Sequence, residues 1–236
     1  MSTVRFLHDP NLAGVFPSPT PAVKHMPQWF RDIRPMSSPD PNHTTVKKCV
    51  PFLEAMSAGF IIPLWADLYV SAVNGTINFT FPQGFPLPAS MESHGYNQIP
   101  GHPLTGNPYG KMPFKLISPW IINTDPGYSC IFTSPMNHME SRLKIMDGVV
   151  DTDAYYNVVN FPFLWTGGDG QFLIPKGTPL VQVIPFQREK HTCEIGVMDV
   201  DRKNNTRALL GTVFADGYRN NYWHKNADRD SDDQQE

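Results

Sequence analysis

The sequence predicts an all-β protein with a few short helices. Its 236 residues include 24 prolines and 17 glycines, while aromatic residues make up 12% and charged residues only 17%. That balance favours many turns and disfavours long, charged surface helices. Short strand-like runs recur along the chain with turn residues between them, which is the pattern of an all-β barrel or sandwich.

The first 50 residues are predicted to form a proline-rich arm. Nine prolines lie within residues 1–51. Each proline fixes φ and lacks a backbone donor, so this stretch does not suit a sheet interior. One helical turn is expected at residues 28–33, where Trp29 and Phe30 suggest packing on the rest of the protein. A flexible leader is the alternative.

The elements that follow are mainly strands. A short helix is expected at residues 50–57, because Pro51 suits a first helical turn and Gly59 follows the last one. Strands at 60–72 and 76–81 flank the dipeptide Asn-Gly, which is typical of a β-hairpin. A loop rich in Gly, Pro and His then covers residues 82–113. The remaining expected elements are strands within 114–124, 129–135, 141–165 and 171–189, and a helix at 207–214.

We therefore divide the chain into three parts: an arm at 1–50, a β domain at 51–200 and a C-terminal extension at 201–236. The net charge is −3, and residues 226–236 carry five acidic residues against one arginine. Binding to nucleic acid through charge is therefore not expected.

Cysteine usage and hydropathy indicate a cytoplasmic protein. Three cysteines without a CxxC spacing point to a reducing compartment and not to a disulfide framework. The start of the sequence does not have the pattern of a signal peptide. Nor does any apolar run approach the roughly 20 residues that a membrane helix needs, so no membrane partner is expected.

The stretch GVVDTDAYYN, residues 148–157, is the first candidate for chemistry. It places Asp151 and Asp153 beside Tyr155 and Tyr156 in a segment that otherwise resembles a strand. Asp is depleted in strands, which suggests another use for the two carboxylates. An Asp at a strand end can act as a general base toward water, and a second carboxylate raises one of the two pKa values. The alternative is that the aspartates cap a turn and the tyrosines fill a β interface.

Four segments, in this order, resemble the dUTPase family: SAGFIIPLWADLYVS, DPGYSCIFTSP, GVVDTDAYY and FLIPKGTPLVQVIPF. The resemblance covers residues 55–186. It implies the β-clip fold, a distorted jelly roll of short strands, in a homotrimer with sites between subunits. It also implies that Asp151 activates water against the α-phosphate of a deoxynucleoside triphosphate bound with Mg²⁺. Tyr155 or Tyr156 would lie under the deoxyribose, and Gln182 would lie near the phosphates.

Two phosphate-binding elements of that family are missing here. SPMNH at residues 134–138 stands in place of its Arg-Ser-Gly, and GYRNNYWHK with an acidic end replaces its Gly-rich C-terminal motif. Asn137, His138 and Glu140 are candidates to replace the phosphate loop and to form a polar pocket with Asp151. A solvated loop is the alternative. Because fold does not imply function, ordinary dUTP hydrolysis does not follow from the resemblance.

A longer set of segments, from VKKCVPFLEAMSAGFIIPL to IPKGTPLVQVIPFQRE, resembles a family from tailed phages and bacteria, typified by cyanophage proteins. That family has no settled activity. The resemblance implies a phage-related source, and therefore a place in the host cytoplasm or in the virion.

Three weaker patterns complete the candidates. His94 and His102 lie in one loop, but an ordinary polar loop is favoured over a metal site. His138 and Glu140 fit the start of a zinc deaminase signature, which is rejected because no Pro-Cys-x-x-Cys follows. Aromatic and basic residues alternate in YRNNYWHK, residues 218–225, where docking on a neighbouring subunit is favoured over stacking on bases.

Three hypotheses for function remain. The first is a protein that binds or hydrolyses a nucleotide di- or triphosphate at an altered site between subunits. The second is a non-enzymatic phage protein, structural or directed at the host, on a β-clip scaffold. The third is a metal-dependent enzyme that uses the histidines. No metal site is assigned to the protein itself, and Mg²⁺ is expected only together with a nucleotide phosphate.

Overall fold

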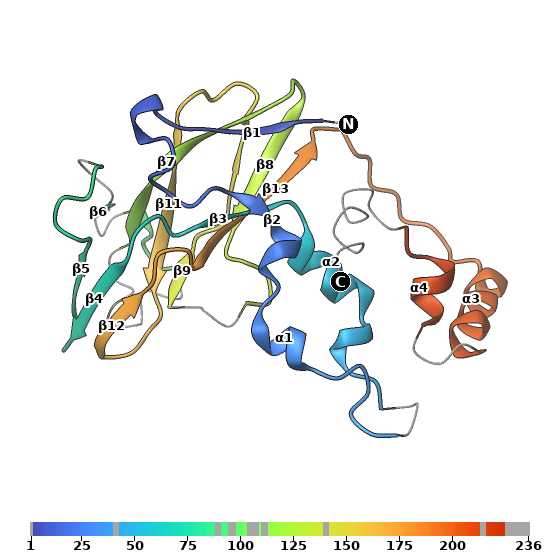
Figure 1. Cartoon of the computed structure of the whole chain (residues 1–236). Coiled ribbons are helices and arrows are strands. Elements are labelled where there is room, and N and C mark those ends of the chain that lie inside the picture. The colour runs from blue at the N-terminus through green and yellow to red at the C-terminus, as the bar shows by residue number, and fades with distance from the viewer. Residues whose placement is uncertain are drawn as a thin grey trace. The chain divides into compact units, whose positions relative to one another are not determined.

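The computed structural model describes residues 2–39, 43–87, 91–93, 98–102, 109, 113–138, 142–212 and 216–224 (Figure 1). Contacts divide the chain into two compact units. Unit 1 contains Met1–His25 and Ala58–Arg188, and unit 2 contains Met26–Ser57 and Glu189–Glu236. The division into arm, β domain and C-terminal extension stays a prediction.

Unit 1 consists of antiparallel strands in three sheets (Figure 1). The first sheet has the order β1-β7-β11-β9, with β6 also paired to β7; the second has the order β10-β8-β13-β3-β2, and the third β12-β4-β5. The all-β class with a few short helices, predicted from the sequence, is confirmed, and the β-clip arrangement stays a prediction. The strands are β1 (Val4–Leu7), β2 (Thr20–Pro21), β3 (Phe60–Pro63), β4 (Leu68–Val73), β5 (Thr76–Thr80), β6 (Met91–Ser93), β7 (Phe114–Thr124), β8 (Tyr128–Thr133), β9 (Leu143–Ile145), β10 (Gly148–Val150), β11 (Val158–Trp165), β12 (Gly170–Ile174) and β13 (Pro179–Gln187).

Several local predictions are confirmed. The helix α2 (Val50–Ser57) has the predicted bounds, and the predicted helical turn is α1 (Gln28–Asp32). The hairpin of β4 and β5 turns at Asn74 and Gly75, whose φ angles are +49° and +79°. Positive φ at both central residues is what an Asn-Gly hairpin turn needs, so the local sequence determines this turn.

Two predictions about element bounds were wrong. Residues 60–72 form two strands in different sheets, because the backbone of Leu64 bonds to the corner before β13. Its N–H donates to the Thr178 carbonyl at 2.8 Å, and its carbonyl accepts from Gly177 N–H at 2.8 Å. The C-terminal helix α3 (Val200–Thr212) begins at Val200 instead of residue 207.

The proline-rich start of the chain supplies strands to both larger sheets of unit 1. β1 pairs with the end of β7, from Val4 opposite Thr124 to Leu7 opposite Ile121. β2 pairs with β3 at the edge of the second sheet. An edge strand tolerates proline, so Pro21 can take part there. Two 3₁₀ turns, η1 (Pro10–Leu12) and η2 (Ala22–His25), also belong to this stretch.

The core of unit 1 is apolar and aromatic. Trp65, Trp165, Phe161 and Phe163 are among the largest fully buried side chains. The ring of Phe79 packs edge-on against Phe163, with centroids 5.3 Å apart. Aromatic pairs of this kind contribute roughly 0.5–1.5 kcal/mol beyond the area that they bury. The three sheets therefore share one hydrophobic centre.

Gly59 makes a close approach between β3 and β13. Its φ is +67°, and a Cβ atom at this position would lie 2.0 Å from the carbonyl oxygen of Val183. The preceding carbonyl, that of Ala58, accepts a hydrogen bond from Gln182 Nε2 at 2.8 Å. The start of β3 is thus held against β13 at a distance that only glycine allows.

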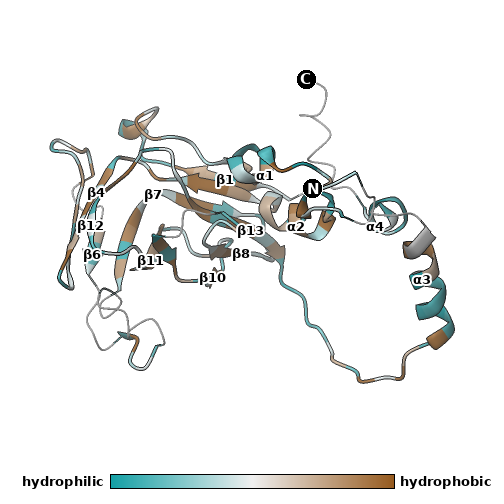
Figure 2. Cartoon of the chain, turned by 90° about the horizontal axis from the view of Figure 1, so that it is seen from below, coloured by the Kyte–Doolittle hydropathy of each residue, from teal (hydrophilic) through white to brown (hydrophobic). Residues whose placement is uncertain are grey.

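Unit 2 contains α1, α2, α3, α4 (Gly217–Asn221) and the 3₁₀ turn η3 (Val46–Lys48). The rings of Trp29, Phe30 and Phe52 pack together, with centroids 5.7–6.0 Å apart. Trp223 Nε1 donates to Glu54 at 2.8 Å. Figure 2 shows that α3 is mostly hydrophilic, whereas the strands are largely hydrophobic. Within the described part of the chain, none of the helices combines the length and apolar character that a membrane span needs.

Candidate functional site

Asp151 and Asp153 lie in a turn between β10 and β11, at residues 151–157. The Asp151 carbonyl accepts from the N–H groups of Ala154 (3.0 Å) and Tyr155 (2.9 Å). The strand character expected for this segment therefore ends at Val150. The alternative interpretation of the sequence, a turn that holds the two aspartates, matches the backbone.

Asp153 is bonded on both carboxylate oxygens. Oδ1 accepts from Arg188 Nη1 at 2.9 Å, and Oδ2 accepts from Arg188 Nη2 and from Gly127 N–H, the latter at 2.8 Å. The Asp153 side chain is only 12% exposed. The guanidinium of Arg188, followed by the Gly127 N–H, lowers the pKa of Asp153 to about 2. The expectation that a second carboxylate raises one of the two pKa values is not met at Asp153, because the Arg188 guanidinium lowers the pKa of this acid.

Asp151 is held in place but open to solvent. Its Oδ1 accepts from Ser129 Oγ at 2.6 Å and lies 3.3 Å from Arg188 Nη1. The side chain is 65% exposed. Its second oxygen, Oδ2, makes no hydrogen bond to another described residue. The result is an oriented carboxylate at the surface of unit 1, with one oxygen available to a ligand or to water.

Arg188 organises this cluster. Its Nη1 also donates to the Tyr128 carbonyl (3.0 Å) and to Ser129 Oγ (2.8 Å), and its own N–H donates to the Gly127 carbonyl at 2.9 Å. One guanidinium thus connects the start of β8, the end of β13 and both aspartates. Sequence reasoning missed Arg188. Two features point to it. Arg188 directly follows β13, and β13 pairs with β8, which begins at the Asp-Pro-Gly-Tyr turn.

Thr152, between the two aspartates, faces the opposite way. It is fully buried, and its hydroxyl lies 2.8 Å from Thr124 Oγ1 and 3.4 Å from Cys130 Sγ. The threonine therefore anchors the turn inward, whereas Asp151 before it is open to solvent. Sequence reasoning missed Thr152 too, although the alternation in the sequence could have indicated it.

The two tyrosines of this turn are exposed: Tyr155 by 44% and Tyr156 by 70%. They lie on the same turn as Asp151, so the structure brings the three predicted residues together. A tyrosine ring at the surface offers a flat apolar face and a hydroxyl that can donate or accept. Neither ring fills a β interface within unit 1.

Gln182 and the 134–138 segment lie elsewhere on unit 1. Gln182 is fully buried; its Oε1 accepts from Met136 N–H at 2.8 Å, and its Nε2 donates to the Ala58 carbonyl. Both ends of this amide are therefore used inside the chain. Asn137 is exposed with a φ of +60°. His138 is half-buried, and burial, with a smaller effect from His25, lowers its pKa. Glu140 lies outside the described residues.

Within one chain the predicted site residues thus form two groups. Gln182 and Arg188 are six residues apart along β13 and its end, which corresponds to about 20 Å at the usual rise of a strand. The group around Arg188 contains Asp151 and Asp153, whereas the group around Gln182 contains Asn137 and His138.

Other predicted candidates receive little support. The described residues contain no group of three or more His, Cys, Asp and Glu that could hold a metal ion. His94 lies outside the described residues, as does Lys225. Two residues of the aromatic and basic segment 218–225 contact each other within unit 2: the Arg219 guanidinium lies over the Trp223 ring, 5.6 Å from its centroid. A single carboxylate such as Asp151 fits Mg²⁺ only when phosphates supply further ligands, which is how nucleotide-bound Mg²⁺ is commonly held.

Comparisons with known proteins give a limited result. No family model matches the chain, and no curated protein does. Among solved structures, the chain is similar to a point-mutant dUTPase from phage phi11 of S. aureus, described with a structural Mg(II) ion. The identity is 11%, the TM-score is 0.33, and the match covers 59% of this chain and 82% of that one.

Proposed function

We propose that this protein binds a deoxynucleoside di- or triphosphate, with Mg²⁺, at a site between subunits of a homotrimer that includes Asp151 and the exposed tyrosines. The proposal rests on the orientation and the exposure of the Asp151 carboxylate. Ser129 and Arg188 fix the orientation of its carboxylate, yet the side chain is 65% exposed. Asp153, in contrast, is mostly buried and uses both of its oxygens within the chain.

The roles of the residues follow from their chemistry. Asp151 would share a Mg²⁺ ion with the phosphates or hold a water molecule, as a general base must. Tyr155 or Tyr156 would lie against the sugar ring. Arg188 is a positioning residue, because it acts on Asp151 through their ion pair and through Ser129. If the protein also hydrolyses its ligand, the water oriented by Asp151 would attack the α-phosphorus and give its proton to Asp151, while the bond to the departing phosphate or pyrophosphate breaks.

The separation of the two residue groups supports a site between subunits. Gln182 and Arg188, around which the two groups gather, are about 20 Å apart along β13 and its end by strand geometry, and neighbouring copies of the chain could bring Asn137 and His138 to the Asp151 of another copy. A homotrimer with sites between subunits would do so. Sedimentation equilibrium of the purified protein tests this part of the proposal independently of any ligand.

Thermal unfolding in the presence of nucleotides is the direct test. A ligand at 100 times its Kd stabilises the folded state by about 2.7 kcal/mol. For a protein of this size, that corresponds to a rise in Tm of roughly 5–10 °C. We expect such a rise with at least one deoxynucleoside di- or triphosphate, larger with Mg²⁺ than with EDTA. Asp151→Asn should abolish the Mg²⁺-dependent part of the shift.

Asp147→Asn is the matched control. Asp147 is also exposed and also accepts from a hydroxyl, Thr133 Oγ1, at 2.5 Å, but no contact links it to Arg188. We expect Asp147→Asn to retain the full shift. Equal shifts in the wild-type protein and in Asp151→Asn would contradict the assignment of Asp151.

The second candidate is a non-enzymatic phage protein on the same scaffold. It is favoured by one observation: the cation beside Asp151 is already paired with Asp153 through two hydrogen bonds, and the Gln182 amide is used inside the chain. Phosphate groups would have to compete with these contacts. No shift with any nucleotide, together with recovery of the protein from purified virions, would favour this candidate.

A further inference from the structure

The sheet β12-β4-β5 has an outer face that the proposed nucleotide site does not use. Alternate residues of each strand point outward, away from buried residues such as Val70 (2% exposed) and Ala72 (fully buried). Strand register aligns the outward side chains in two rows that cross all three strands and in a pair at the hairpin end, Val73 and Thr76. The first row is Leu173, Tyr69 and Thr80, and the second is Gln171, Ser71 and Asn78.

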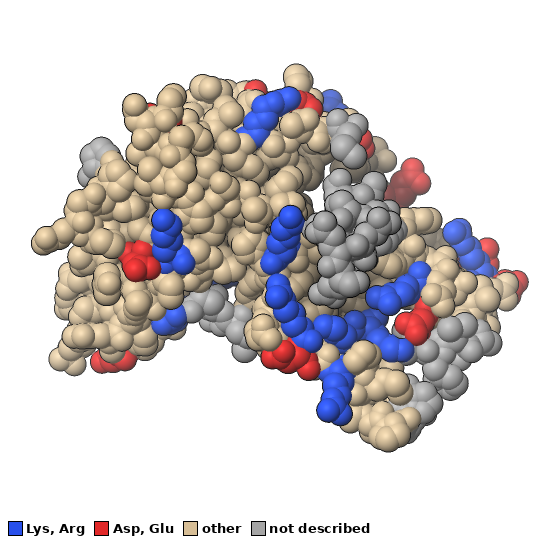
Figure 3. All heavy atoms as spheres, in the orientation of Figure 1, with Lys and Arg blue, Asp and Glu red and all other residues tan. Residues whose placement is uncertain are grey.

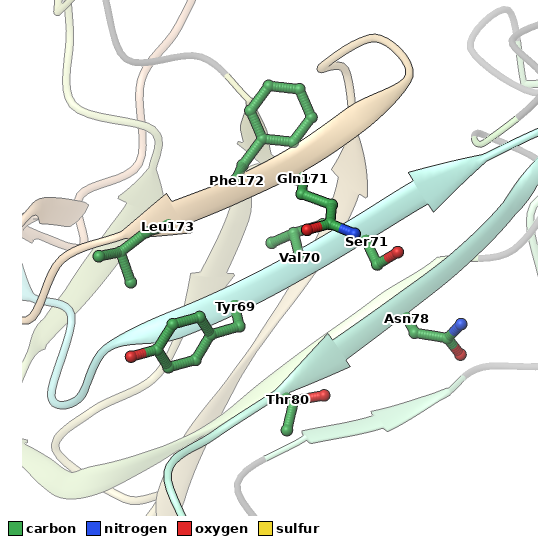
Figure 4. Close-up of a pocket in the computed structure, with 8 residues that line it drawn as sticks. All are labelled: Tyr69, Val70, Ser71, Asn78, Thr80, Gln171, Phe172 and Leu173. Carbon is green, nitrogen blue, oxygen red and sulfur yellow. The ribbon is translucent and has the colours of Figure 1, made fainter.

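The two rows differ in chemistry. Tyr69 is 50% exposed and Leu173 is 46% exposed, so the first row offers an aromatic ring flanked by an apolar and a hydroxyl side chain. The second row offers two amides and a hydroxyl (Figure 4). Within the described part of the chain, none of the polar side chains in the two rows is hydrogen-bonded to another residue. Their donors and acceptors are therefore free for a ligand.

This face is also uncharged. β4, β5 and β12 contain no Asp, Glu, Lys or Arg, and Figure 3 shows mainly uncharged residues on the visible surface over the strands of unit 1. The side chains line a shallow, open depression with a volume of about 410 Å³. That volume lies within the range typical of small-molecule sites, roughly 300–1,000 Å³.

We propose that this face binds a neutral carbohydrate, with the sugar ring stacked on Tyr69. A sugar has a face of C–H groups that packs on an aromatic ring, and its hydroxyls both donate and accept hydrogen bonds. Amides and hydroxyls match that dual capacity, whereas Lys, Arg, Asp and Glu offer only one kind of group when charged. Gln171 and Asn78 lie on either side of Ser71, so they would contact hydroxyls at opposite edges of the ring.

Two other occupants fit less well. A phosphorylated or carboxylated ligand would need a cation, and these three strands carry none. The centre of a protein–protein interface is usually apolar or aromatic, whereas here the row Gln171, Ser71 and Asn78 crosses the middle strand. The binding of a neutral sugar explains both the aromatic residue and the uncharged polar row.

The test uses the full-length chain on an array of immobilised oligosaccharides. The array contains neutral hexose and N-acetylhexosamine oligomers together with sialylated and sulfated counterparts. We expect binding to at least one neutral oligomer, without a gain from added negative charge. The dissociation constant for the strongest soluble oligomer is then measured by calorimetry for the wild-type protein and for the variants.

Four variants make the result specific. Tyr69→Phe retains the ring and should bind within about threefold of wild type, whereas Tyr69→Leu retains only apolar area and should lose at least tenfold, a difference of about 1.4 kcal/mol. Gln171→Ala should weaken binding by about fivefold to tenfold, as expected for one hydrogen bond. Tyr218→Ala, which removes a tyrosine of similar exposure (46%) from unit 2, is the control and should bind as wild type.

Several results would overturn the proposal. One is the absence of binding to every neutral oligomer, and another is equal affinity of Tyr69→Leu and the wild-type protein. A third is a change of oligomeric state in Tyr69→Leu, because this would identify the face as an interface between copies of the chain. Because Tyr69 points away from the core, the variants should fold, and Tyr69→Phe stays informative in any case. The nucleotide experiments involve Asp151, in the turn between β10 and β11 and outside this sheet, so failure of one proposal leaves the other standing.

Discussion

Replacing Gly59 with alanine tests the close approach between β3 and β13. The added Cβ would meet the Val183 carbonyl oxygen at 2.0 Å, although ordinary contacts of a Cβ begin near 3.4 Å. The overlap involves backbone atoms, so a rotamer change cannot relieve it. Val183 is also paired with Phe60 on one side and Phe132 on the other, so a shift of β13 disturbs both neighbouring strands.

Two contributions set the expected loss of stability. Gly59 has a φ of +67°, and this left-handed conformation costs an L-residue roughly 1–2 kcal/mol. Overpacking in a well-packed region costs typically 1–3 kcal/mol more. The sum is about 2–5 kcal/mol. For a protein of this size, that lowers the Tm by roughly 4–20 °C.

Gly14→Ala separates the two contributions. Gly14 has nearly the same φ, +73°, but a Cβ there would have no atom within 4 Å. Only the conformational cost applies, so we expect a loss of about 1–2 kcal/mol. Urea unfolding followed by tryptophan fluorescence measures both variants. Equal losses for Gly59→Ala and Gly14→Ala would refute the close-packing argument, because the backbone conformation alone would then explain the effect.

Two further predictions concern polar residues of unit 1. Folding lowers the pKa of Asp153 from 3.8 to about 2, so the ionised form stabilises the fold above about pH 4, and this stabilisation is lost as the pH falls toward 2. Asp153→Asn should therefore unfold less steeply with acid over that range in a fluorescence titration; an unchanged profile would contradict the ion pair with Arg188. Gln182→Ala removes a buried amide and the partner of two backbone groups, Met136 N–H and the Ala58 carbonyl, and should cost about 2–4 kcal/mol in urea unfolding. Gln171→Ala, an exposed control, should change stability by less than about 0.5 kcal/mol.

The elements that sequence predicts well are those specified locally. Asn74-Gly75 determines its own hairpin, and Pro51 and Gly59 delimit α2. The strand pairs that sequence missed depend on distant partners. β1 is a short stretch of the arm whose place is set by β7, more than 100 residues later, and no local pattern indicates that pairing.

The same distinction applies to the candidate site. The sequence located Asp151 and Asp153 because acids are unusual in such a segment, and it placed two tyrosines beside them. It could not show that the acids lie in a turn, since Gly127 and Arg188, which hold Asp153, are 26 and 35 residues away. The expected role of Gln182 near phosphates stays a prediction, as do the roles of Asn137 and His138.

The position of Arg188 at the end of unit 1 has a mechanical consequence. The chain leaves the β body directly after this residue and continues as the exposed segment Glu189–Asp199. The residue that orients Asp151 is therefore also the last residue of the β body, and a pull on the segment would first meet the hydrogen bonds of Arg188 to Gly127, Tyr128 and Asp153.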